Sequence, residues 1–163
     1  MEPKADRPQA PTTYGIGRDG SAPGERLPWS RVEEWLEQSR NYWVCTTRHD
    51  GRPHAKPVWG LWMDGMVLFS TSPESVTARN LARSLEAVIH LESGDEVAIL
   101  EGRIEPWRGD SELRREFADR YEAKYDHRPE DDDPGTPVFA LRPRKALSWT
   151  EQDFPSSATR WSF

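Results

Sequence analysis

The chain has 163 residues, a length that suits one domain with a real hydrophobic core rather than two. Its formal net charge of −6 at pH 7 argues against a general nucleic-acid-binding protein, which needs a surplus of Lys and Arg. The single cysteine, Cys45, excludes an intrachain disulfide and a Cys-based zinc site. No apolar run approaches the roughly 20 residues of a membrane helix, and no hydrophobic signal segment begins the chain. We therefore expect a soluble cytoplasmic protein without membrane or nucleic-acid partners.

Residues 1–27 are rich in Pro, Gly and charge and show no periodicity. This predicts a disordered N-terminal tail before a single domain over residues 28–163. Pro28 suits the first turn of a helix, and the apolar spacing that follows predicts an amphipathic helix from Pro28 to Ser39. Its apolar side would hold Trp29, Val32, Trp35 and Leu36.

The next stretch predicts three antiparallel strands, Asn41–Thr47, Pro53–Met63 and Met66–Thr71. Asp50-Gly51 and Asp64-Gly65 separate them, and Asp-Gly between apolar runs is a strong hairpin signal because type I′ turns need positive φ at both central residues. Alternation divides the second strand between two faces, with His54, Lys56, Val58, Gly60 and Trp62 on one and Ala55, Pro57, Trp59, Leu61 and Met63 on the other. Pro57 predicts an edge position or a bulge, because proline cannot donate to a ladder.

Ser72 can cap a following helix with Pro73 at its first position. On this helix Leu81 belongs to the apolar side, whereas Arg79 and Asn80 are predicted to point away from it. The remaining predicted elements are strands Glu86–Leu91 and Glu96–Glu105, a helix beginning at Asp110 or Ser111 that carries Leu113, Phe117, Tyr121 and Tyr125, a solvated loop over Arg128–Thr136, and strands Pro137–Arg142 and Lys145–Thr150. About seven antiparallel strands with three flanking helices favour a mainly β fold that closes into a small barrel.

Several runs resemble a known family: Tyr42 to Thr47, Asp50 to Gly60, Phe69 to Thr71, Ala78 to Leu81, Val88 to Glu92, Val97 to Ile104 and Ala158 to Phe163. Together they are similar to the FMN-binding split β-barrel proteins of the pyridoxamine 5′-phosphate oxidase-like superfamily, and most of all to the actinobacterial oxidoreductases that use the deazaflavin coenzyme F-420. The resemblance covers roughly residues 28–163. It implies a homodimer with the cofactor in a groove at the subunit interface.

The resemblance also implies a set of cofactor-binding residues: Lys56, Pro57, Val58, Trp59, Ser70, Thr71, Ser75, Thr77, Arg79 and Asn80. Where relatives carry a basic pair after the serine, this chain has Val76 and Thr77. Arg79, Lys56 or Arg52 are candidates to replace that charge. No catalytic residue is assigned, because hydride chemistry on a flavin-type ring needs no dedicated acid–base pair.

Simpler interpretations remain open for several of these residues. Lys56 could be a solvated strand lysine, Trp59 a core residue, and the segment from Ser72 to Ser75 an ordinary helix cap rather than an anion site. His54 and His90 lack Cys, Asp or Glu at ligand spacing, which disfavours a metal site. Three further expectations are a solvated run at Asp131–Asp133, an inert buried thiol at Cys45, and a role for Arg160 and Trp161 in closing the groove or packing a dimer.

The expected function is hydride transfer between coenzyme F-420 and a small organic substrate. Two alternatives stay open: an FMN-binding pyridoxamine-phosphate-oxidase-like protein, which would allow oxidase chemistry, and a non-catalytic module that binds a flavin or haem.

Overall fold

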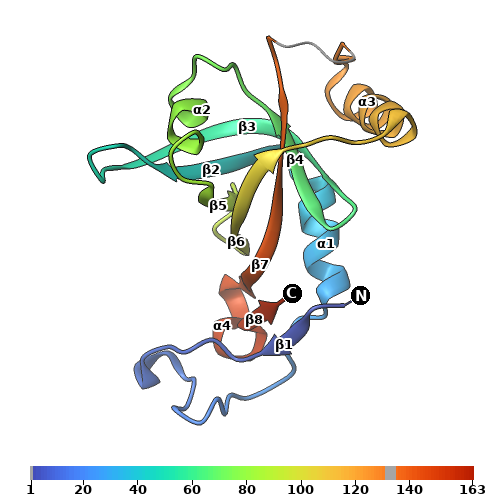
Figure 1. Ribbon diagram of the computed structural model, residues 1–163. Coiled ribbons are helices and arrows are strands. Elements are labelled where there is room, and N and C mark those ends of the chain that lie inside the picture. Colours follow the sequence, from blue (N-terminus) through green and yellow to red (C-terminus); the bar gives the residue numbers. More distant parts are fainter. Residues whose placement is uncertain (1, 131–134) are drawn as a thin grey trace.

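In the computed structural model, which describes residues 2–130 and 135–163, eight strands form one sheet (Figure 1). They are β1 Lys4–Asp6, β2 Asn41–Thr47, β3 Pro53–Met63, β4 Met66–Ser70, β5 Glu86–Leu91, β6 Glu96–Pro106, β7 Val138–Thr150 and β8 Thr159–Ser162. The order is β1-β8-β7-β4-β3-β2-β5-β6, and β7 also pairs with β6. The strands β2 to β7 therefore close into a barrel, and β8 and β1 extend from it. The predicted mainly β split barrel is confirmed.

Four α-helices flank the barrel in the described residues: α1 Trp29–Gln38, α2 Val76–Leu81, α3 Ser111–Tyr125 and α4 Phe154–Ser157. Two short 3-10 turns, Thr12–Tyr14 and Glu151–Asp153, complete the elements there. The helix α1 buries the four predicted apolar residues in the main core. The three predicted helices correspond to α1, α2 and α3. None of the helices in the described ranges is long and apolar enough to cross a membrane.

The last two predicted strands form one continuous strand, β7, so the predicted break at residues 143–144 is wrong. The pairing register between β6 and β7 shifts between Glu101 and Gly102, and Arg144 has no register partner in β6. A Cβ on Gly102 would lie 2.3 Å from the Arg142 carbonyl oxygen, so only glycine fits at this close approach.

The two Asp-Gly hairpins differ. Asp64 and Gly65 both have positive φ, 50° and 70°, which confirms the predicted type I′ turn. In the other turn only Gly51 is left-handed, with φ 84°, so the type I′ prediction there is wrong. The Arg48 amide donates to the Arg52 carbonyl oxygen at 2.9 Å. This hydrogen bond closes a hairpin that needs a left-handed conformation only at Gly51.

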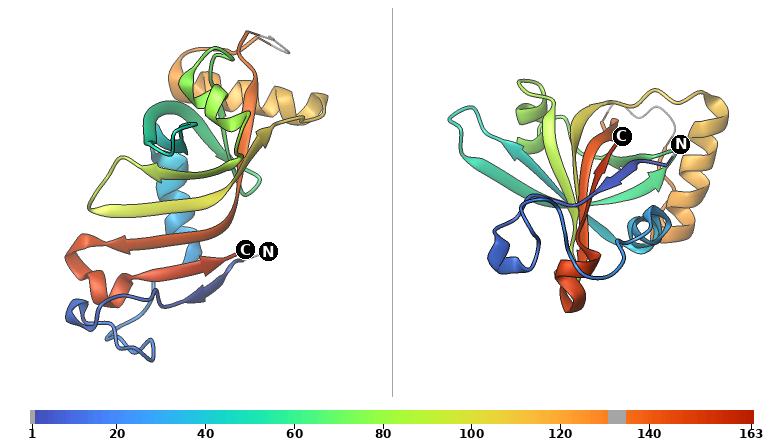
Figure 2. Two further views of the ribbon diagram at one scale, coloured as in Figure 1. Left: turned by 60° about the vertical axis from the view of Figure 1, so that its left-hand side comes forward. Right: turned by 90° about the horizontal axis from the view of Figure 1, so that it is seen from below.

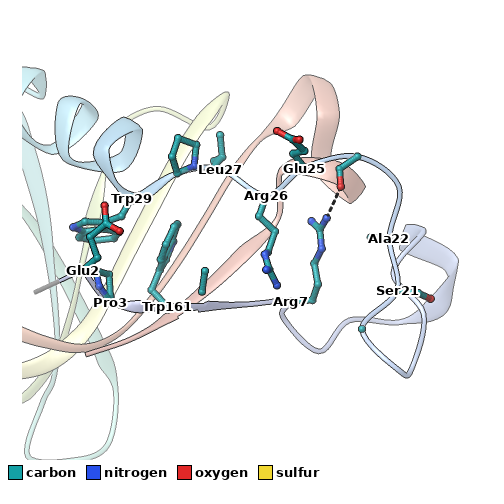
Figure 3. A pocket seen from close by; sticks show the side chains of 14 residues that line it. Glu2, Pro3, Arg7, Ser21, Ala22, Glu25, Arg26, Leu27, Trp29 and Trp161 are labelled. Carbon is teal, nitrogen blue, oxygen red and sulfur yellow. Dashed lines mark hydrogen bonds between the residues drawn. The ribbon is translucent and has the colours of Figure 1, made fainter.

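The N-terminal segment differs from the predicted disordered tail. The strand β1 pairs antiparallel with β8, and this brings the two ends of the chain together (Figure 2). The Arg7 guanidinium donates to the carbonyl oxygens of Pro155, Ser156, Ala158 and Gly24. A cavity of about 690 Å³ lies between this segment and the indoles of Trp29 and Trp161 (Figure 3). Short strands escape prediction because three residues carry no readable alternation.

The barrel has two separate apolar cores. The inner core joins α1 to the inward faces of the strands. The second core lies outside the barrel, where α3 covers β3, β4 and β7 (Figure 2). It contains the predicted helical stripe of α3, with Phe117, Tyr121 and Tyr125 buried against Leu61, Met63, Leu68 and Ala140. One side of the barrel wall is thus covered by the chain itself.

Candidate functional site

The first half of β3 is a free sheet edge. Residues 53–59 pair with β2 alone, whereas β4 pairs only with residues 60–63. Pro57 lies on this free edge, as its missing N–H predicted. Lys56 and Pro57 are exposed, but the Val58 side chain is 8 % exposed and packs in the inner core. Of the predicted cofactor contacts in β3, the side chains of Lys56, Pro57 and Trp59 are therefore accessible.

A buried polar cluster links β2, β3 and α2. The Asn80 amide donates to Thr46 Oγ1 at 2.9 Å, and His54 Nδ1 lies 3.4 Å from the same oxygen. Asn80 is 6 % exposed, so the prediction that it points away from the core is wrong. The physical reason is that Thr46 satisfies the amide, which makes burial of this polar side chain tolerable.

The helix α2 begins later than predicted, at Val76, with Ser75 rather than Ser72 as its cap. Ser75 Oγ accepts from the Ala78 amide at 3.0 Å, and Thr71 Oγ1 donates to Ser75 Oγ at 3.0 Å. Ser72 Oγ instead accepts from the Glu74 amide at 3.2 Å. The structure therefore joins two predicted site residues, Thr71 and Ser75, in one hydroxyl pair.

Other predicted residues already have protein partners. Ser70 Oγ donates to the carbonyl oxygens of Thr136 and Pro137, which ties β4 to the start of β7. Arg79 is exposed, and its Nη1 donates to the Glu74 carbonyl oxygen at 2.7 Å. Arg52, a candidate replacement for the missing basic pair, is paired with Asp50 at 2.8 Å. Thr77 is completely buried, and its hydroxyl has no hydrogen-bond partner among the described residues.

The free edge of β3 is electropositive although the chain is acidic. The Lys56 side chain makes no hydrogen bond or ion pair with any residue in the described ranges. Burial, followed by the nearby charges of Arg48 and Lys56, lowers the pKa of His54. Cys45 lies half-buried in the neighbouring strand rather than fully buried, and burial raises the pKa of its thiol. A protonated thiol fits the predicted lack of reactivity.

Trp59 lies on the other face of β3 and is separated from His54 and Lys56 by the strand. Its ring stacks on Tyr125 with centroids 4.8 Å apart, and the Arg40 guanidinium lies 5.6 Å from both centroids. Trp59 remains 40 % exposed. Sequence reasoning missed Arg40 and Tyr125 as its partners, because contacts between residues far apart in the chain, 66 residues for Tyr125, leave no local periodicity.

The close approach predicted at Gly60 is made by the protein itself. A Cβ there would lie 2.7 Å from the Leu68 carbonyl oxygen. The Gly60 amide donates to the Tyr125 hydroxyl at 2.9 Å, and Lys124 Nζ donates to the Gly60 carbonyl oxygen at 3.2 Å. Burial, with Arg120 next, lowers the pKa of Lys124 to about 8. Gly60 is therefore a structural position between β3 and α3.

A pocket of about 760 Å³, which sequence reasoning missed, opens between α3 and the ends of β4, β6 and β7. Ser70 and Thr71 line it, together with aromatic and basic residues from α3 and the adjoining loops. The described residues contain no cluster of three His, Cys, Asp or Glu side chains able to hold a metal ion. The predicted solvated run at Asp131–Asp133 lies outside the described residues.

The family model described as pyridoxamine 5′-phosphate oxidase matches residues 29–150. The chain belongs to the pyridoxamine 5′-phosphate oxidase family. No curated protein matches the chain.

Several solved structures share the fold at low identity. A conserved hypothetical protein from Mycobacterium tuberculosis is 21% identical with a TM-score of 0.66, and the match covers 81% of this chain and 92% of that one. An F420 reductase is 20% identical with a TM-score of 0.55, covering 70% and 94%. A heme binding protein from Mycobacterium smegmatis is 20% identical with a TM-score of 0.59, covering 81% and 62%.

Proposed function

We propose that two copies of this chain form a homodimer that binds coenzyme F-420 along the free edge of β3 and transfers a hydride to a small organic substrate. The observation that carries the proposal is the accessible, electropositive edge around Lys56 in a chain of this family. Its fold similarity to an F420 reductase adds support for the deazaflavin.

The residues present fit an acidic, ring-bearing cofactor. Lys56 offers an ammonium that is unpaired within the described ranges. A compact ammonium can bind a phosphate or a carboxylate without bidentate geometry. The Thr71–Ser75 hydroxyl pair lies at the start of α2, and the buried Thr77 hydroxyl keeps unused hydrogen-bonding capacity two residues later. In the proposed site the Thr71 and Ser75 hydroxyls would supply by hydrogen bonding part of the charge lost at Val76 and Thr77, whereas the Thr77 hydroxyl is completely buried.

An apolar row on the outside of the barrel supports the homodimer. We call it the outer row: Pro57, Trp43, His90, Ile99 and Leu147, which are register partners across five neighbouring strands. Residues directly opposite in antiparallel pairs share a face, and this face is opposite the buried inner core. All but the exposed Pro57 are half-buried, so a second copy would find a contiguous surface, apolar apart from the His90 imidazole, that ends at the β3 edge.

When bound, the deazaflavin supplies the hydride. The protein would orient the cofactor and the substrate, complement their charge and exclude water. Lys56 would hold the acidic end, the Thr71 and Ser75 hydroxyls would fix its position, and the second copy would cover the open side of the edge. This assignment of roles fits the lack of an evident catalytic acid–base constellation among the described residues.

FMN is the second candidate cofactor, because its single phosphate would use the same ammonium and hydroxyl groups and the family is a flavin-binding one. A module that binds a flavin or haem without turnover is the third possibility. A protein of this fold is described as binding heme, and that description gives the module its support.

Titration of the purified protein with F-420, FMN and haem separates these functions. We expect saturable F-420 binding and hydride transfer from the reduced coenzyme to a test enone. Tight FMN binding with a yellow protein would favour FMN, and binding without turnover over a substrate panel would favour the module. Lys56→Ala and Arg79→Ala should each weaken F-420 binding, about tenfold for Lys56 because one charge-assisted hydrogen bond is lost.

Arg115→Ala removes an exposed charge from α3 and serves as the matched control, with Glu116→Ala as a second surface control. Equal losses in all four variants would remove Lys56 and Arg79 from the site. Failure of all three cofactors to bind would reject the proposed function itself.

A further inference from the structure

We infer that His54 presents a fixed, uncharged Nε2–H donor to an acceptor oxygen of the ligand at the β3 edge, and that Thr46 and Asn80 hold its imidazole in this tautomer. The imidazole is half-buried and belongs to the free part of β3, where residues 53–59 pair with β2 alone. The ligand in this inference rests on the proposed function. The tautomer does not, because it follows from hydrogen bonds within the chain.

The tautomer follows from the order of donors and acceptors in the buried polar cluster. The Asn80 side-chain nitrogen can only donate, so the Thr46 oxygen, 2.9 Å away, accepts. Thr46 is buried, and its own hydroxyl hydrogen therefore needs an acceptor. Among the described residues, His54 Nδ1 at 3.4 Å is the only atom placed to accept it. Nδ1 thus carries no hydrogen, and the neutral ring carries its single hydrogen at Nε2.

The position of the ring directs this hydrogen toward the free edge. His54 and Thr46 are register partners in β3 and β2, so Nδ1 faces β2. The two ring nitrogens lie on different sides of an imidazole, and Nε2 therefore points away from β2. Nε2 makes no hydrogen bond with any residue in the ranges 2–130 and 135–163. One N–H donor is thus left available beside the edge that the proposed cofactor occupies.

The surroundings keep the imidazole of His54 uncharged at pH 7. Burial, followed by the nearby charges of Arg48 and Lys56, lowers its pKa from the ordinary value of 6.5. The side chains that β2 and α2 turn toward the ring, Thr46 and Asn80, are uncharged. In the part of the chain that the structure describes, no carboxylate lies within ion-pair distance of the ring. A neutral imidazole donates a hydrogen bond without giving up its proton, which suits a carbonyl oxygen.

Two oxygens of the proposed reaction fit such a donor. One is a ring carbonyl of the deazaflavin, and the other is the carbonyl of an enone substrate. A donor at the substrate oxygen would favour the reaction, because negative charge develops there when a hydride arrives at the conjugated carbon. A donor at the ring carbonyl would instead strengthen cofactor binding. The two sources share one chemistry and differ in the step that loss of His54 impairs.

NMR of the imidazole nitrogens in the cofactor-free protein at pH 8 tests the tautomer. The chain has four histidines, which serve as references for one another. His54 should be protonated at Nε2, whereas His90 should be protonated at Nδ1, because its Nδ1 donates to a backbone carbonyl oxygen at 2.7 Å. The exposed His49 and His127 should show averaged signals. Thr46→Val should move the His54 signals toward this average, and Thr46→Ser should keep them in place.

Ligand titration tests the donor. His54→Leu removes the imidazole, whereas His54→Gln keeps an N–H near the position of Nε2. We expect His54→Leu to lose about tenfold in affinity for F-420 if the acceptor is the ring carbonyl. If the acceptor is the substrate, F-420 affinity should stay and kcat/KM for cyclohex-2-enone should fall about tenfold. His54→Gln should recover most of either loss. His49→Leu, which removes an exposed imidazole from the adjoining turn, is the matched control and should stay within about twofold of the parent.

Three results would overturn the inference while leaving the proposed function intact. These are protonation of His54 at Nδ1, no response of its signals to Thr46→Val, and equal behaviour of His54→Leu and His49→Leu in protein that binds F-420. A parent protein that binds neither F-420 nor FMN would reject the proposed function instead, and with it the ligand of His54. An unchanged melting temperature in each variant shows that a loss is not unfolding.

Discussion

The two outer sides of the barrel are built alike but covered differently. On one side Leu68 and Met63 face outward and are almost completely buried, because α3 lies over them. On the other side the outer row also faces outward, yet Trp43, Ile99 and Leu147 remain half-buried. The comparison shows that this chain supplies a cover for one wall and leaves the other wall apolar, which is the feature that a second copy would use.

The two walls also differ in their pattern of burial. The strand β4 is apolar at four successive positions, and both of its faces are buried, one in the inner core and one under α3. The strand β5 alternates instead, with Ala87, Ile89 and Leu91 buried and with Val88 and His90 half-buried. Burial of both strand faces thus marks the wall that is covered within the chain. An apolar run alone does not, because β6 is also apolar from Val97 to Leu100 although Ile99 lies in the outer row.

The strongest test of the covered wall is Phe117→Ala. Phe117 is 4 % exposed and lies in the core under α3, so its loss should lower the free energy of unfolding by about 3–5 kcal/mol. Urea denaturation at pH 7 measures the change. The neighbouring Glu116→Ala, on the exposed side of α3, should stay within about 0.5 kcal/mol. A loss of that small size at Phe117 would mean that α3 is only loosely attached to the barrel.

Trp43→Glu tests the uncovered wall. A charge in the middle of the outer row should separate the proposed dimer, since central interface tryptophans contribute about 2–4 kcal/mol or more. Sedimentation should then show the mass of one chain for the variant and of two for the parent, with unchanged circular dichroism. Thr47→Glu is the matched control, because Thr47 is exposed at the end of the same strand. A monomeric parent protein would contradict the dimer directly.

Much of the fold could be predicted because its signals are local. The strands β2, β3 and β5 begin and end where alternation and the Asp-Gly turns placed them. The capping of α3 by Asp110 was also readable, since its side chain accepts from the first amides of the helix. Signals of this kind depend on neighbouring residues, so they can be read without knowledge of distant contacts.

The site was less predictable because it depends on distant pairs. The inward turn of Asn80 requires Thr46, 34 residues earlier in the chain. The Trp59 stack on Tyr125 and the pocket beside α3 likewise join elements far apart in sequence. The resemblance to a family identified the strands and the helix that carry the site. It could not show which of their side chains already have partners, as Ser70 and Arg79 do.

The pH dependence of stability shows what it costs to desolvate a charged side chain where α3 covers the barrel. Lys124 of α3 is partly buried, which lowers its pKa to about 8, and the outer row carries no lysine. An unfolded lysine titrates at its ordinary value of 10.5, so the unfolded chain binds more protons between pH 8 and 10.5. Stability should therefore rise with pH through the lower part of that window.

Above pH 10 the sign reverses. Burial raises the pKa of Tyr125 to about 12 and raises that of Tyr42, so the unfolded tyrosines ionise first and the unfolded chain binds fewer protons. Urea denaturation from pH 7 to 11 should thus show a maximum of stability near pH 10. In Lys124→Met the rise should vanish while the fall remains, because only the lysine is removed. A rise of equal size in both proteins would show that the Lys124 ammonium stays fully hydrated in the folded chain. Packing the C-terminal turn of α3 on the barrel would then cost no desolvation of Lys124.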